Sequence, residues 1–97
     1  MREDIRYKAA GLALRCGEIT TIQEVCGIIP ASVVAKDLAM NYRRFITKML
    51  GSGWPCMFDV INFARLLDVS PVDLFAAILR DKEREKLRLI ELTSKEI

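Results

Sequence analysis

Apolar residues recur along the chain at spacings of three and four positions rather than two. This spacing is the period of an amphipathic α-helix, and no segment shows the alternation typical of a strand. The pattern predicts helices at about residues 3–15, 20–27, 33–39, 42–50 and 57–67, and a sixth that begins at residue 71 and runs into a charged tail. We therefore expect a compact all-α domain of five or six helices.

Capping residues support several of these helix starts. Residues 20–24 contain two overlapping capping boxes, one beginning at each threonine. Ser32 and Asn41 each precede an apolar periodic run and are predicted N-caps. Ser70 followed by Pro71 is the strongest start, since serine suits the cap and proline suits the first helical position.

The length of 97 residues and the apolar share of 52% fit one globular domain with a single core. We divide it into an N-terminal helix (1–19), a central helical core (20–80) and a charged helical tail (81–97). In the N-terminal helix, the predicted inward side comprises Ile5, Ala9, Leu12 and Ala13. The tail ends in an apolar set that could fold back onto the first helix or pair with a second copy; this set comprises Leu87, Leu89, Ile90 and Leu92.

Several function classes are disfavoured by composition. The chain has no histidine, which removes the familiar Ser-His and Cys-His nucleophiles and histidine metal sites. Cys16, Cys26 and Cys56 form no Cys-x-x-Cys pair and are expected to be small, buried free thiols. We expect no enzymatic activity, cofactor, metal or small-molecule substrate.

No stretch of about 18 uncharged apolar residues exists, so no membrane span is expected. The N-terminus carries acidic residues and lacks an apolar export signal, which favours a cytoplasmic location.

Positive charge is concentrated in one segment. The net charge of the chain is only +2, but residues 30–50 carry four basic side chains against the lone Asp37, which gives +3. An anionic partner would be attracted there. On a helical wheel of residues 41–50, Arg43, Arg44, Thr47 and Lys48 share one polar arc. The opposite arc is apolar and comprises Tyr42, Phe45, Ile46, Met49 and Leu50.

The stretch from Ser32 to Phe45, followed by the 58–67 helix and the Val69–Phe75 segment, resembles the small helix-turn-helix regulators of the lambda-repressor and Cro class. The resemblance implies a dimer that binds double-stranded DNA and reads the major groove with the helix at residues 41–50. One departure concerns Ala39, which stands where the family usually has glycine at the turn. Either the turn is built differently, or Asn41 accepts the unusual backbone angles.

In this interpretation, some polar side chains are predicted to reach the base edges and others only the phosphates. Arg43, Arg44 and Thr47 are the candidates for base contacts, and Ser32, Lys36, Asn41 and Lys48 for phosphate contacts. Tyr42 is expected to lie in the core, and Trp54 either to anchor a partner or to lie across the adjacent helix. The alternative function is a protein-interaction module, such as an adaptor or antitoxin-like partner, on the same scaffold.

Overall fold

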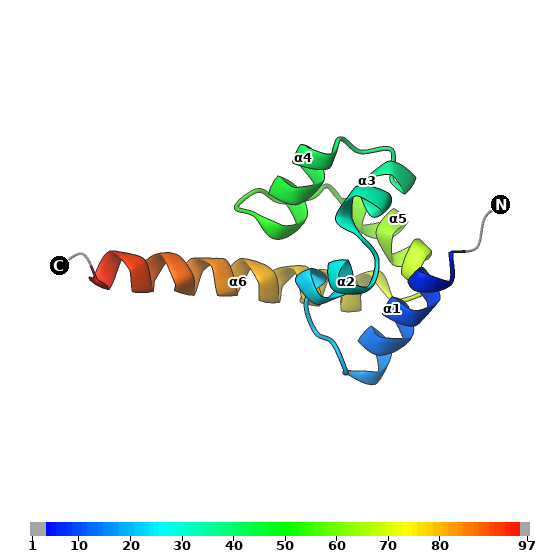
Figure 1. Ribbon diagram of the computed structural model, residues 1–97, viewed down its shortest axis with the longest axis horizontal. Helices are drawn as coiled ribbons and strands as arrows, with labels where there is room; N and C mark the ends of the chain where they lie inside the picture. Colours follow the sequence, from blue (N-terminus) through cyan, green and yellow to red (C-terminus); the bar gives the residue numbers. More distant parts are fainter. Residues whose placement is uncertain (1–3, 96–97) are drawn as a thin grey trace.

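The computed structural model describes residues 4–95, and all regular structure within that range is helical (Figure 1). The helices are α1 (Ile5–Cys16), α2 (Ile22–Ile28), α3 (Ala31–Asp37), α4 (Tyr42–Phe45), α5 (Met57–Leu67) and α6 (Pro71–Lys95). A π-helical turn, η1 (Ile46–Leu50), continues α4 directly. The predicted all-α class with five or six helices is confirmed.

The core lies where α1 to α5 surround the N-terminal half of α6 (Figure 1). Phe45 of α4 and Phe63 of α5 are fully buried, and their ring centroids lie 5.9 Å apart in a tilted arrangement. Aromatic pairs at this separation add to the stabilisation that burial alone provides. Met49, Leu74 and Ile78 belong to the same buried cluster as the two rings. The apolar arc predicted for residues 42–50 therefore holds the end of α4 and η1 against the core.

The predicted caps are confirmed at three helix starts and wrong at one. Thr21 caps α2 and accepts a hydrogen bond from Glu24 N at 3.3 Å. Ser70 Oγ accepts from Val72 N at 3.2 Å at the start of α6, and Asn41 caps α4. Ser32 is not a cap, because α3 begins two residues earlier than predicted, at Ala31, directly after Pro30. Proline fixes its own φ near the helical value and so favours helix immediately after it.

The predicted inward side of α1 is wrong. Ile5 is 79% exposed and Leu12 is 53% exposed, whereas Tyr7, Ala10 and Gly11 are buried. Gly11 explains this face, since a Cβ at that position would lie 1.8 Å from the carbonyl oxygen of Leu67. The backbones of α1 and α5 approach closely there, and only glycine permits that approach.

The tail does not fold back onto α1. Helix α6 continues without a break to Lys95, and its C-terminal half extends away from the other helices (Figure 1). Leu87 and Ile90 are 60% and 52% exposed; Leu89 and Leu92 lie outside the residues whose side chains are described. The extension gives the domain its long dimension of 53 Å. Among the described residues, no helix combines the length and apolar character needed to cross a membrane.

Candidate nucleic-acid interface

The segment from α3 to η1 is a pair of short helices joined by a tight turn. Val34 and Ala35 on α3 are buried, as are Phe45 and Met49 at the end of α4 and in η1. This shared apolar underside fixes the two helices on the core. The other faces of both helices point to solvent, as a helix that enters a DNA groove requires.

The turn is built by Ala39 itself. Its φ is 56°, in the left-handed region that glycine occupies most easily, and Met40 N donates to Ala35 O at 2.8 Å across the turn. Asn41 has an ordinary φ of −64°. Both alternatives drawn from the sequence were therefore wrong. The turn is not built differently, since its backbone is left-handed at the expected position, Ala39, and Asn41 does not take the unusual backbone angles. This left-handed conformation costs an L-residue about 1–2 kcal/mol of free energy.

Asn41 organises the first turn of α4. Its Oδ1 accepts hydrogen bonds from Arg43 N at 2.9 Å and from Arg44 N at 3.4 Å. These bonds satisfy two of the amide groups that a helix start leaves without intrahelical partners. The cap fixes the backbone from which the two arginine side chains extend.

Arg43 and Arg44 are exposed. Among the residues that the structure describes, the ion pairs join Arg6 to Asp4 and Arg15 to Asp68, and neither involves α4. The two guanidinium groups therefore face water without a carboxylate partner within residues 4–95. Thr47, four positions after Arg43 and thus on the same side of the helix, is also exposed.

The remaining predicted site residues lie apart from this trio. Ser32 and Lys36 are exposed and four positions apart on α3, so they share one face of that helix. Lys48 is only partly exposed, and the Cδ atom of its side chain passes close to Gly53. The charge of Lys48 also helps to lower the pKa of Lys82 on α6, although burial is the larger cause. The side chain of Lys48 therefore lies beside the 51–54 loop rather than among the exposed side chains at the start of α4.

Tyr42 is a surface residue that the sequence interpretation assigned to the core. It is 55% exposed in the first turn of α4, next to Arg43. Tyr42 lies on the apolar side of the helical wheel. A wheel does not show how far the core extends along the helix, and the first turn of α4 lies beyond the edge of the core. The exposed ring adds a stacking and hydrogen-bonding group to the arginine-bearing surface.

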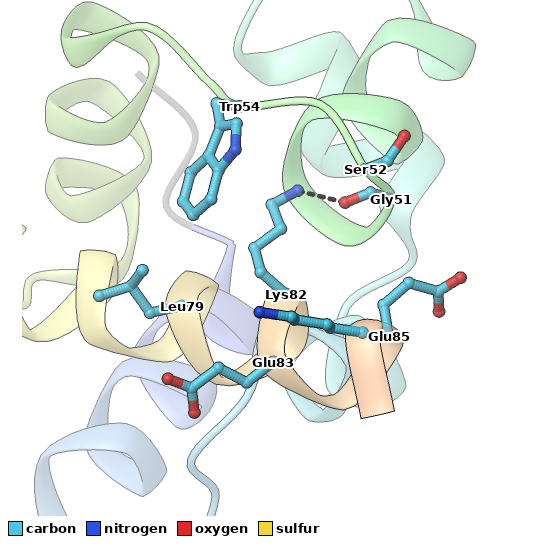
Figure 2. A pocket seen from close by; sticks show the side chains of 8 residues that line it. Gly51, Ser52, Trp54, Leu79, Lys82, Glu83 and Glu85 are labelled. Atoms are coloured by element: carbon cyan, nitrogen blue, oxygen red, sulfur yellow. Dashed lines mark hydrogen bonds between the residues drawn. The ribbon is translucent and has the colours of Figure 1, made fainter. Parts of the chain in front are cut away.

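Lys82 was missed altogether, because it lies 31 residues after the turn in which it acts. Its Nζ donates to Lys48 O at 2.7 Å, at the C-terminal end of η1. It also donates to Gly51 O, and Figure 2 shows this second bond. A cation at this end of a helix satisfies free carbonyl groups and complements the macrodipole. No local signal in a charged run identifies which lysine points inward.

Trp54 packs against α6, which agrees with the packing alternative, although α6 is not the helix next to the Trp54 loop in the sequence. Its ring centroid is 6.3 Å from that of Phe75 and 5.5 Å from Lys82 Nζ. The indole nevertheless remains 50% exposed. Figure 2 shows it standing over a groove between the 51–54 loop and α6.

The cysteines are less buried than the composition suggested. Cys16 and Cys56 are exposed, and the expectation of burial was wrong for both. Cys26 is partly buried, and burial raises the pKa of its thiol to about 11, so it stays protonated at neutral pH. No cluster of three metal-ligating side chains occurs among the described residues.

No protein-family model, curated protein or solved structure matches this chain.

Proposed function

We propose that this protein binds double-stranded DNA as a transcriptional regulator, with α4 entering the major groove. The observation that carries the proposal is the pair Arg43 and Arg44, exposed in the capped first turn of α4 and without carboxylate partners among the described residues. The N-terminal end of such a helix is the part that contacts base edges in helix-turn-helix proteins.

The exposed trio has the chemistry for base recognition. An arginine can donate two parallel hydrogen bonds to guanine O6 and N7, and the Thr47 methyl group can contact a thymine methyl. Ser32 and Lys36 on α3 supply a hydroxyl and a cation for phosphates. Lys48 lies beside Gly53 rather than next to the arginines, so it is not counted among these phosphate contacts. The cap assigns Asn41 Oδ1 to the helix backbone, which leaves only its amide group for a phosphate.

The modest number of cations favours binding as a dimer. Strong binding usually rests on about 6–10 phosphate contacts, more than one α3–α4 unit offers. Two copies would double the contacts and engage half-sites about 34–36 Å apart. We also propose a cytoplasmic location, where a regulator of this kind would meet DNA in a cell without a nucleus.

The direct test measures fluorescence anisotropy of a mixed-sequence duplex of about 30 base pairs at several salt concentrations. We expect affinity to fall as salt rises, and Arg43→Ala with Arg44→Ala to abolish binding at moderate salt. Lys8→Ala with Arg65→Ala removes the same charge from exposed positions on α1 and α5 and should preserve binding.

Sequence preference is tested by selecting bound duplexes from a random pool. Thr47→Ala should change the selected base at one position per half-site and weaken binding to the preferred base, while the salt dependence stays the same. Absence of binding by the folded wild-type protein at low salt would reject the proposal and favour the protein-interaction alternative.

A further inference from the structure

A stripe of four side chains runs along one exposed face of α6. Leu79, Glu83, Lys86 and Ile90 are spaced by four, three and four residues, so they lie in line on one side of the helix. All four are exposed, and Leu79 and Ile90 are 38% and 52% accessible. The stripe begins at Leu79, where other helices pack against α6, and ends at Ile90, on the part of α6 that extends away from them.

A groove of about 320 Å³ adjoins the first half of this stripe. Gly51, Ser52 and Trp54 form one wall, and Leu79, Lys82 and Lys86 are among the α6 residues that form the other. Figure 2 shows the Trp54 ring above the groove and Leu79 on the α6 side. The half-exposed indole thus enlarges the apolar area next to Leu79.

The order of the stripe is self-complementary. Read forward it is apolar, acidic, basic, apolar, and read backward it is apolar, basic, acidic, apolar, with the same spacing. We propose that a second copy of this chain covers the stripe, with two α6 helices pairing antiparallel about a twofold axis between Arg84 and Glu85. Leu79 then lies opposite Ile90 of the second copy, and Glu83 lies opposite its Lys86.

The charges select this arrangement over the parallel one. In an in-register parallel pair, Glu83 would face Glu83 and Lys86 would face Lys86, which is destabilising. The antiparallel pair instead forms two opposite-charge contacts and two apolar contacts, because a twofold axis repeats each contact. Ile90 of each copy also approaches the groove under Trp54 of the other. This inference is independent of DNA binding, since all of its observations lie on α6 and the 51–54 loop.

The proposed contact is small. The segment from Leu79 to Ile90 is about 18 Å long at 1.5 Å per residue, and a standard interface buries about 800 Å² per partner. We therefore expect a reversible dimer with a dissociation constant in the micromolar range. Its population will change over the protein concentrations that sedimentation equilibrium can examine.

The test combines sedimentation equilibrium of the full chain with charge reversals on the stripe. Glu83→Lys and Lys86→Glu should each weaken dimerisation at least tenfold, because each places like charges opposite one another twice. An equimolar mixture of the two variants should form a heterodimer within about threefold of the wild-type affinity. Glu91→Lys makes the same charge change at an exposed position of α6 outside the stripe, and should leave the dissociation constant unchanged.

Circular dichroism of each variant verifies that α6 remains helical, so that weakened dimerisation is not caused by unfolding. Trp54→Ala should weaken the dimer as well, and indole fluorescence of the wild-type protein should shift to shorter wavelength as the protein concentration rises. A wild-type chain that stays monomeric at millimolar concentration would overturn the proposal. So would a dimer that Glu83→Lys does not weaken, since that dimer would use another surface or a parallel arrangement.

Discussion

Asp81 and Lys82, neighbours in the sequence, hold the ends of two different helices. Asp81 Oδ2 accepts from Ile22 N at 2.6 Å and its Oδ1 accepts from Gln23 N at 3.4 Å, at the N-terminus of α2. Lys82 Nζ donates to carbonyl groups at the C-terminus of η1. The carboxylate thus meets the positive end of one helix and the ammonium group meets the negative end of another. Helix α6 thereby fixes α2 and the end of the α4–η1 unit relative to each other.

Replacing Asp81 tests the first of these contacts. Asp81→Ala leaves the buried Ile22 amide without its acceptor, and we expect a loss of about 1–3 kcal/mol in the free energy of unfolding. Asp81→Asn keeps an oxygen acceptor and should cost less than half as much. Urea denaturation at neutral pH measures both, with Glu91→Ala as an exposed carboxylate control on the same helix that should be neutral.

The same residue makes a prediction about pH. Burial raises the pKa of Asp81 above the ordinary aspartate value, and this outweighs the lowering effect of the two amide donors. The folded state therefore binds the proton more tightly than the unfolded state, so the contribution of Asp81 to stability is greatest below the unfolded pKa and decreases as pH rises through the folded one. The stability of the wild type relative to Asp81→Asn should fall as the pH rises above the ordinary aspartate pKa of about 3.9. An unchanged or growing difference would contradict the prediction.

Lys82→Met should also destabilise the fold. Methionine retains the apolar stem but loses both hydrogen bonds from the ammonium group, and hydrogen bonds to charged groups contribute about 1.5–3 kcal/mol. Thermal denaturation should show a lower Tm, whereas Lys8→Met, at an exposed position on α1, should change it little. An equal Tm for Lys82→Met and wild type would show that the contacts to Lys48 O and Gly51 O contribute no net stability.

Ala39→Gly should stabilise the protein. Glycine adopts the left-handed conformation of Ala39 without steric cost, which gains about 1 kcal/mol and raises the Tm by about 4–8 °C. Ala9→Gly is a suitable contrast, because Ala9 is exposed within helix α1, where glycine costs about 0.5–1 kcal/mol. The two Ala→Gly substitutions are therefore expected to shift the Tm in opposite directions, and a loss of stability at both would show that the turn is not strained.

Gly11→Ala should destabilise the protein even though alanine favours helix. The added Cβ meets the carbonyl oxygen of Leu67, so α1 and α5 must separate, and overpacking of this kind costs about 1–3 kcal/mol. Gly27→Ala is the matched control: Gly27 lies in α2 with nothing within 4 Å of an added Cβ, and it should gain about 0.5–1 kcal/mol. A gain of stability at both positions would contradict the close approach of α1 to α5.

Local sequence signals determined where most of the helices begin, and the start of α3 is the exception. The caps at Thr21, Asn41 and Ser70 act on amide groups within three residues. The two glycines and the proline at positions 51–55 disfavour helix in the loop between η1 and α5. Such signals depend on neighbours along the chain, so they can be identified without knowledge of the fold. The exposed arginines of α4 were predictable for the same reason, since they lie opposite apolar residues of α4 and η1 such as Phe45 and Met49, which are buried.

Tertiary structure alone decided which side chains meet across long separations. The inward face of α1 depends on the backbone of α5 at Gly11, and the exposure of Tyr42 depends on where the core ends. The contact of Asp81 with Ile22 joins residues 59 positions apart. No helical period distinguishes Asp81 and Lys82 from the other charges around them, because their burial is set by the helix ends packed against α6.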